Sequence, residues 1–367
     1  MIKRILYLPL LIVGMLLFQG CFSSITIEDK LKFDEADFTL TKEPDSLPVI
    51  KTLETNGNLF KNSLSFYRGH LFAAEYSGRI YVFDLETLKE DGYASTRNTS
   101  ITSSPVFAGD FMYYLYKKKQ NPGFQLVKYN IVKGKEVSDS KIGAMGKGEL
   151  FKIEGRLVVV AESGIYILDT LGSLIKKFEV NGSISADPLQ FEDKIVAGLT
   201  TGEILELDAT KNEISYFKSG SGEVVTTFFP IGDNYLAGFE GGGLKLIGRS
   251  GYEFWSVKTG RVNAVPVISN GEVIFGDLSG MLYRVSLKTG EIKNSYQTGG
   301  MIDLKVFATT SKIIVPVTEG KIILFDRVTL KPIQEIGTEG RIRTGVINFR
   351  NFLFIGHDNG KILVIQI

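Results

Sequence analysis

The chain has 367 residues, with 42 lysines and arginines against 41 aspartates and glutamates, so its formal net charge is only +1. A nearly neutral chain without a clustered basic face does not fit a nucleic-acid-binding protein. The single cysteine, Cys21, excludes an intramolecular disulfide because it has no partner.

The first 20 residues have the pattern of a secretory signal peptide. Lys3 and Arg4 precede an apolar run from Ile5 to Phe18, and Gly20 stands directly before Cys21. The alternative is a transmembrane anchor, but the run is shorter than the roughly 20 apolar residues that a spanning helix needs. We therefore expect residues 1–20 to be removed from the mature protein.

The position of Cys21 resembles the lipobox of bacterial lipoproteins, although Phe18 and Gln19 stand where leucine and a small residue are commoner. The resemblance implies cleavage before Cys21 and attachment of lipid to its thiol. Phe22, rather than aspartate, follows the cysteine, and in the enterobacterial sorting rule this favours the outer membrane. The expected location is thus the periplasmic face of the outer membrane.

Residues 22–47 contain seven acidic and three lysine side chains and no hairpin signal. We interpret residues 21–47 as a lipidated, flexible tether. The alternative interpretation is an acidic docking segment. In the next stretch, Pro48–Glu54, apolar and polar residues alternate as they do in a β-strand.

From residue 48 onward the chain repeats one unit. A short apolar strand followed by a glycine in the next turn recurs along the chain. These closing glycines are Gly78, Gly164, Gly202, Gly242, Gly280, Gly320 and Gly360. Their spacings are 86, 38, 40, 38, 40 and 40 residues, and the stretch 111–123 supplies the unit missing from the first interval. A period near 40 with about four short strands per unit is typical of a β-propeller.

The sequence therefore predicts an all-β fold over residues 48–367, an eight-bladed β-propeller with four-stranded blades. A chain of this length often forms two domains, but propellers are long single domains. The last unit ends after its third strand, at Ile367. We expect Pro48–Glu54 to provide the missing outer strand and so to close the ring.

Residues that could carry chemistry are few. The two histidines, His70 and His357, lie at different positions of the repeat, so a shared metal site is not expected. No nucleophile elbow, zinc-protease motif or P-loop is present. We expect no catalytic residue, no metal site and no cofactor.

Carboxylates recur near one hairpin position of the repeat, at Glu162, Glu240, Asp277, Glu319 and Asp358. They could form a ring of charge, but acidic side chains before a turn more commonly accept hydrogen bonds from nearby backbone amides. Trp255 ends a fourth strand, and we interpret it as packing between blades rather than as a stacking platform.

The repeat itself, with the pattern seen in Val265–Gly290, resembles the quinoprotein (PQQ-type) repeat. Eight such repeats behind a lipobox resemble the BamB family of outer-membrane assembly lipoproteins, over about residues 48–367. The resemblance implies a non-catalytic scaffold that binds the periplasmic domains of a BamA-like barrel-forming subunit. It implies a monomer within a larger complex.

In that family the partner-contact loop lies between the outer strand of the fourth blade and the next blade, and it carries apolar residues and an arginine. By repeat register the matching stretch is 178–182, where Phe178, Val180 and Asn181 stand without an arginine. A second inter-blade loop contains Arg341 and Arg343, and arginine and apolar anchors are prominent in protein interfaces. We expect these five residues to mark the partner-facing rim. The alternative is that Phe178 and Val180 only pack a strand end and that the arginines are solvated.

Two other functions stay open. One is an envelope propeller lipoprotein that binds a different protein or a glycan. The other, less favoured, is a quinoprotein dehydrogenase, whose family carries a vicinal cysteine pair and a tryptophan in most blades. This chain has one cysteine and one tryptophan.

Overall fold

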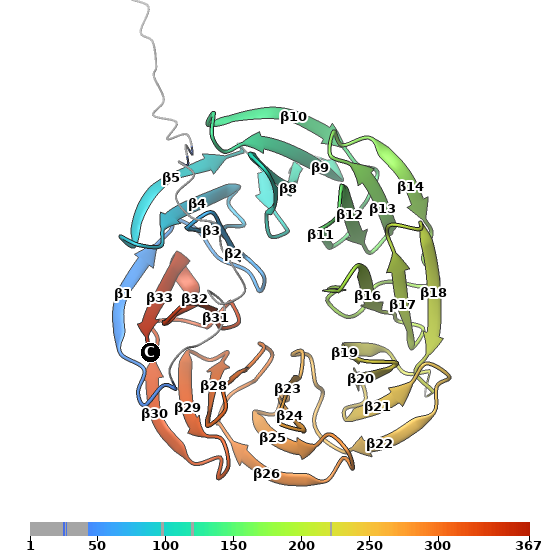
Figure 1. Cartoon of the computed structure of the whole chain (residues 1–367), viewed down its shortest axis with the longest axis vertical. Coiled ribbons are helices and arrows are strands. Elements are labelled where there is room, and N and C mark those ends of the chain that lie inside the picture. Colours follow the sequence, from blue (N-terminus) through green and yellow to red (C-terminus); the bar gives the residue numbers. More distant parts are fainter. Residues whose placement is uncertain (1–24, 26, 28–42, 97–98, 119–120, 221) are drawn as a thin grey trace, which may run out of the picture.

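The computed structural model describes residues 25, 27, 43–96, 99–118, 121–220 and 222–367. Eight antiparallel sheets surround a central axis and form a closed ring (Figure 1). The only helical element of the described residues is a short 3-10 turn, Asp358–Gly360. The expected all-β, eight-bladed propeller is therefore confirmed.

Blades 1 to 4 follow the chain from the axis outward. Their strands are, for blade 1, β2 (Leu64–Tyr67), β3 (His70–Ala74), β4 (Arg79–Asp84) and β5 (Lys89–Ser95); for blade 2, β6 (Thr99–Ile101), β7 (Val106–Ala108), β8 (Phe111–Lys118), β9 (Asn121–Asn130) and β10 (Lys135–Lys141); for blade 3, β11 (Gly148–Ile153), β12 (Arg156–Ala161), β13 (Gly164–Asp169) and β14 (Leu174–Phe178); for blade 4, β15 (Leu189–Phe191), β16 (Lys194–Gly198), β17 (Glu203–Asp208) and β18 (Glu213–Lys218). In blade 2 the innermost strand is divided, since β6 and β7 both pair with β8.

Blades 5 to 8 repeat the arrangement. Their strands are, for blade 5, β19 (Val225–Ile231), β20 (Asn234–Phe239), β21 (Leu244–Gly248) and β22 (Glu253–Val257); for blade 6, β23 (Val267–Ser269), β24 (Glu272–Gly276), β25 (Met281–Ser286) and β26 (Ile292–Gln297); for blade 7, β27 (Phe307–Ala308), β28 (Lys312–Val317), β29 (Lys321–Asp326) and β30 (Pro332–Gly337); for blade 8, β31 (Ile347–Phe349), β32 (Phe352–His357), β33 (Lys361–Gln366) and β1 (Val49–Glu54).

The expected closure by the N-terminal strand is confirmed. β1 pairs antiparallel with β33, with Leu53 opposite Ile362. Just beyond the strand, the amide and the hydroxyl of Thr55 both donate to the carbonyl of Gly360, at 2.8 and 3.0 Å. Leu53 is buried in the apolar cluster that joins blade 8 to blade 1. One strand thus completes the last blade and seals the seam to the first.

Eight apolar clusters fill the interfaces between neighbouring blades. Central strands such as β24 are buried on both faces, whereas outer strands such as β26 alternate between exposed and half-buried side chains. Trp255 of blade 5 packs against the apolar side chains of blade 6, and its indole Nε1 donates to the carbonyl of Leu287 at 2.9 Å. Trp255 is an inter-blade contact, as expected.

The antiparallel order gives the ring two distinct faces. The turns between first and second strands and between third and fourth strands lie on one face, here called the turn face. The hairpins between second and third strands lie on the other, the loop face, together with the loops that connect consecutive blades. In blade 2, for example, the amide of Ile131 donates to the carbonyl of Asp110, so its two turns on the turn face are in contact.

The expected signal peptide, residues 1–20, and Cys21 lie outside the described residues. The expected tether, residues 21–47, is described only at Ile25, at Ile27 and from Glu43 onward, and these residues contact the blades. The division into signal peptide, tether and propeller stays a prediction. Within the described part of the chain, no helix has the length and apolar character to cross a bilayer.

Replacing Gly290 tests the packing around Trp255. Gly290 has a φ of +73°, and an added Cβ would lie 2.8 to 2.9 Å from the indole ring. Gly271 has a similar φ of +70° but open space around it. Both Gly→Ala changes incur the cost of a left-handed backbone, about 1–2 kcal/mol, while Gly290→Ala adds about 1–3 kcal/mol of overpacking. Denaturant titration of the two variants measures the difference, and equal losses of unfolding free energy would contradict this packing.

Removal of β1 tests the closure. A chain that starts at Asn56 exposes the edge of β33 and invites edge-to-edge association. We expect it to melt at a lower temperature and to be less soluble than a chain that starts at Asp45, which keeps β1. Equal melting temperatures would mean that β1 contributes nothing to the ring.

Candidate functional site

The first predicted partner loop connects blade 3 to blade 4 on the loop face. Phe178 is the last residue of β14, and both Phe178 and Val180 are half-buried against the apolar cluster between these blades. Asn181 is exposed. The two apolar residues therefore pack the end of the blade, and Asn181 is the one of the three predicted residues that is exposed to a partner.

The second predicted loop connects blade 7 to blade 8. Arg343 forms an ion pair with Asp358 through its Nε. The amide of Arg341 donates to the same carboxylate at 3.1 Å, while the Arg341 side chain is exposed. Burial alone would raise the pKa of Asp358, but the hydrogen bond from Arg343 and its charge hold that pKa below its usual range. Asp358 thus fixes the loop backbone and leaves the Arg341 guanidinium free to face solvent.

The two loops share the loop face but not one side of the ring. The loop after β14 and the loop after β30 lie on opposite sides of the central axis (Figure 1). The structure therefore does not bring Phe178, Val180 and Asn181 together with Arg341 and Arg343. A partner that touches both loops has to extend across the centre of the ring.

The recurring hairpin carboxylates have a common structural role. In four blades the carboxylate accepts a hydrogen bond from the loop that leads into the same blade. The donor–acceptor pairs are Gly57 with Glu75 at 2.7 Å, Gly260 with Asp277 at 2.8 Å, Met301 with Glu319 at 2.7 Å, and Arg341 with Asp358 at 3.1 Å. The interpretation of these side chains as acceptors for backbone amides is confirmed for Asp277, Glu319 and Asp358. Glu75, near the same position of the repeat, was not among the predicted carboxylates.

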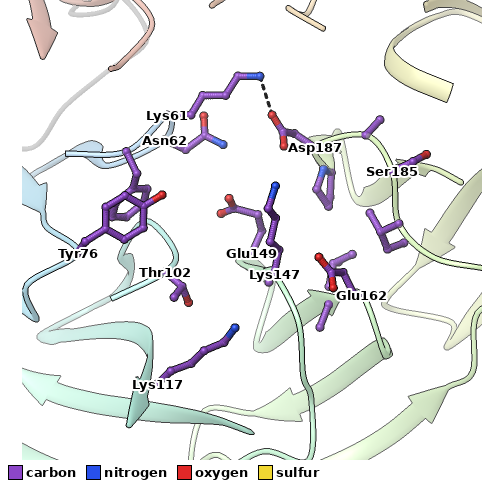
Figure 2. A pocket seen from close by; sticks show the side chains of 17 residues that line it. Lys61, Asn62, Tyr76, Thr102, Lys117, Lys147, Glu149, Glu162, Ser185 and Asp187 are labelled. Carbon is purple, nitrogen blue, oxygen red and sulfur yellow. Dashed lines mark ion pairs between the residues drawn. The ribbon is translucent and has the colours of Figure 1, made fainter. Parts of the chain in front are cut away.

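A cavity of about 340 Å³ lies on the loop face and is lined by residues of blades 1 to 4 (Figure 2). Charged side chains of both signs line it, namely Lys61, Lys117, Lys147, Glu149, Glu162 and Asp187. Lys61 of blade 1 forms an ion pair with Asp187 of blade 4, at 2.7 Å. Lys117 donates to the carbonyl of Gly146, and burial lowers the pKa of its amine.

Glu149 occupies the cavity wall at the start of blade 3. Burial raises its pKa to about 8, the nearby Asp187 carboxylate adds to the increase, and a hydrogen bond with Asn62 opposes it. Ser185, which also lines the cavity, donates its hydroxyl to the carbonyl of Val225 rather than to a base. Such a lining offers polar contacts to a small charged group or to a partner side chain, and it presents no activated nucleophile.

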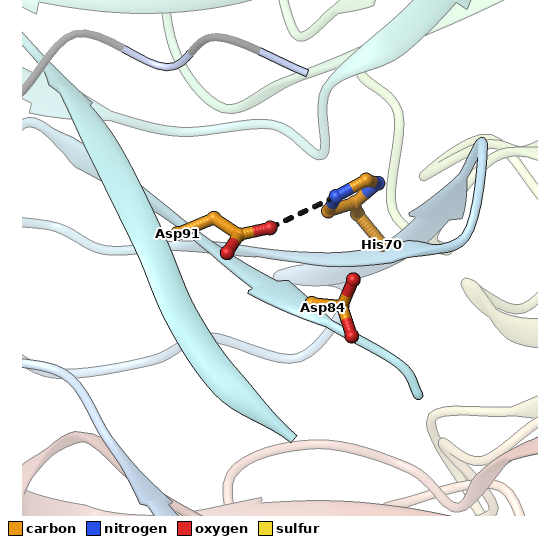
Figure 3. A group of neighbouring side chains, drawn as sticks. All are labelled: His70, Asp84 and Asp91. Atoms are coloured by element: carbon orange, nitrogen blue, oxygen red, sulfur yellow. Dashed lines mark hydrogen bonds and ion pairs between the residues drawn. The ribbon is translucent and has the colours of Figure 1, made fainter. Parts of the chain in front are cut away.

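A second group, His70, Asp84 and Asp91, lies within blade 1 (Figure 3). The His70 ring contacts Asp91 through Nε2 at 3.0 Å and the carbonyl of Arg68 through Nδ1 at 2.7 Å. Asp84 accepts the amides of Glu86 and Thr87 in the following turn. Both imidazole nitrogens and Asp84 already have partners, so this group fixes a turn of the blade.

Comparison with known proteins supports the fold and nothing finer. No family model and no curated protein matches the sequence. Among solved structures, BamB from Moraxella catarrhalis has 13% identity and a TM-score of 0.72, covering 88% of this chain and 100% of that one. Sqt1 of Saccharomyces cerevisiae has 10% identity and a TM-score of 0.71 over 87% and 98% of the two chains. The C-terminal WD40 domain of Sif2 has 14% identity and a TM-score of 0.67, over 88% and 98%.

The elevated pKa of Glu149 predicts how stability depends on pH. A carboxyl that binds its proton more tightly in the folded state loses stability as pH rises from its ordinary pKa of 4.5 to its folded value of about 8. We expect the melting temperature of the wild type to fall between about pH 5 and about pH 9 more than that of Glu149→Gln. Glu154→Gln, an exposed change in the same blade, is the control. Parallel pH profiles for the wild type and Glu149→Gln would contradict the assignment.

Proposed function

We propose that this chain is a lipid-anchored, non-catalytic scaffold of the bacterial outer membrane. In this proposal residues 1–20 are a signal peptide, Cys21 carries the lipid, and the propeller stands on the periplasmic side. It assists the assembly of outer-membrane β-barrel proteins by binding a BamA-like barrel-forming subunit.

The observation that carries the proposal is the correspondence with BamB over the whole of that protein's chain, joined to the lipobox at Cys21. Sqt1 and the WD40 domain of Sif2 match the propeller fold at similar TM-scores, so the fold alone does not indicate which partner this protein binds. The resemblance of the sequence at Cys21 to a lipobox favours an envelope protein, and the charged lining of the cavity favours binding.

The loop face is the proposed partner surface. Its inter-blade loops are anchored to the blades by hairpin carboxylates, as Asp358 anchors Arg341. A loop held in this way presents its exposed side chains at little further entropic cost, which favours binding. Asn181 and Arg341 are its exposed representatives among the predicted residues, and Phe178, Val180 and Arg343 support the loops from beneath.

Charge reversal on each face of one blade tests the partner surface. Arg341→Glu alters the loop face of blade 8, and Arg350→Glu alters its turn face. Arg350 adopts a φ of 50°, close to the φ of 48° and 54° that Glu154 and Glu192 adopt in blades 3 and 4, so its turn accepts glutamate. We expect Arg341→Glu to reduce co-purification of the barrel-forming subunit in mild detergent about tenfold, as loss of an interface hot spot does. Arg350→Glu is expected to leave capture unchanged.

Two results would count against the proposal. Equal capture by both variants would show that the interface does not include the loop after β30. Failure of the wild type to capture the barrel-forming subunit would favour the alternative, an envelope propeller lipoprotein that binds another protein or a glycan.

A further inference from the structure

Two residues far upstream of the blades are buried in the ring. Ile25 and Ile27, here called the N-terminal clip, are 1% and 2% exposed. They belong to the apolar cluster between blades 1 and 2, which includes Phe72 and Met112. The amide of Ile27 donates to the carbonyl of Ile131 at 2.9 Å, and the backbone of Ile25 is hydrogen-bonded to the hydroxyl of Tyr129.

The clip lies on the turn face. Ile131, its hydrogen-bond partner, directly follows β9 and begins the turn between the third and fourth strands of blade 2. The apolar side chains of the clip therefore fill the end of the seam between blades 1 and 2, at the edge opposite the inter-blade loops.

A second contact places the other end of the same segment on the turn face. The carboxylate of Glu43 accepts hydrogen bonds from Thr309, Thr310 and Ser311, which form the turn between β27 and β28. Burial alone would raise the pKa of Glu43, but these hydrogen bonds outweigh it and lower that pKa. Leu47 then packs between blades 7 and 8, and its amide donates to Gln334 at 2.7 Å.

From these contacts we infer that the N-terminal clip holds the lipid anchor at the seam between blades 1 and 2, so that an anionic phospholipid bilayer lies against the turn face. The inference rests on the proposed acylation of Cys21. Three residues lie between Cys21 and Ile25, and the four Cα-to-Cα steps from one to the other span at most about 14 Å. A tether that was free from residue 22 to residue 47 would reach roughly 90 Å and would leave the orientation open.

The surface beside the clip suits a bilayer. Val132, which follows the clip's partner Ile131, is 40% exposed. Lys133, in the same turn, and Lys135, the first residue of β10, are exposed as well. An apolar side chain beside lysines can enter the headgroup boundary while the amines contact anionic phosphates. With the turn face on the membrane, the inter-blade loops point into the periplasm, where a soluble domain of a partner can reach them.

A fluorophore on each face measures the orientation. Cys21 is the only cysteine, so once it is acylated an introduced cysteine is the one free thiol. Lys133→Cys reports on the turn face, and Met145→Cys, at a side chain that is 51% exposed in the loop between blades 2 and 3, reports on the loop face. The full acylated protein is placed in phosphatidylethanolamine–phosphatidylglycerol vesicles that carry a headgroup-attached quencher. We expect several-fold stronger quenching at position 133 than at position 145.

The clip is then disrupted in the same two labelled proteins. Ile25→Asp combined with Ile27→Asp is expected to abolish the difference in quenching, whereas Ile333→Asp, at a side chain that is 46% exposed on β30, is expected to preserve it. Hydrogen exchange at the Ile27 amide provides a second measurement, and we expect that amide to be protected even in the unacylated Cys21→Ala protein.

The outcomes separate this inference from the proposed function. An acylated protein with equal quenching at the two positions, or a difference that survives loss of the clip, overturns the orientation alone. A mature protein without lipid on Cys21 overturns the proposed anchoring and the inference together. Neither outcome bears on capture of the barrel-forming subunit in detergent.

Discussion

The pairing of β1 with β33 is the constraint on which the other features of this protein depend. A propeller blade has exposed edges and faces until its neighbours cover them, so a ring with an open last blade would leave both an unpaired strand and an uncovered apolar seam. Here the strand that precedes the first blade completes the last one, and Leu53 enters the cluster between them. Every other interface repeats the same apolar packing between sheets. Rigid closure is also what gives the ring two fixed faces.

The two tasks proposed for the protein, membrane attachment and partner binding, are assigned to opposite faces of the ring. The turn face receives the N-terminal clip and the Glu43 contact, and both belong to the segment that leads from Cys21. The loop face carries the connections between blades and the cavity lined by blades 1 to 4. In the proposal, attachment and recognition therefore use opposite ends of the same sheets. Neither requires a catalytic group.

Much of the fold could be predicted from the sequence because short local patterns of residues specify its strands and turns. Glycines such as Gly280 recur where a hairpin needs positive φ, and the period near 40 residues gives the blade number. The strand-like alternation of Pro48–Glu54, ahead of the first repeat, indicated the closure. The divided inner strand of blade 2 could not be predicted in this way, since β6 and β7 are short and both depend on pairing with β8.

The candidate site was less accessible to sequence reasoning, because its residues meet only in three dimensions. Val180 looks like a surface anchor in a loop, yet it packs against blades 3 and 4. The cavity combines Lys61, Glu149 and Asp187 from three blades, and the pKa of Glu149 reflects burial that no local pattern shows. Ile25 and Ile27 lie in a polar stretch that indicates a tether, and only their burial in the apolar cluster between blades 1 and 2 identifies them as a clip. The hairpin carboxylates were the exception, since their repeat register already suggested a backbone acceptor.

Cross-linking in living cells tests the central claim, a scaffold that binds the barrel-forming subunit through its loop face, most directly. A photoreactive amino acid is placed at position 341 on the loop face or at position 350 on the turn face of blade 8, and adducts are identified by mass spectrometry after illumination. The account predicts an adduct with the barrel-forming subunit from position 341 and none from position 350. No adduct with that subunit from position 341, or equal adducts from both positions, would contradict it.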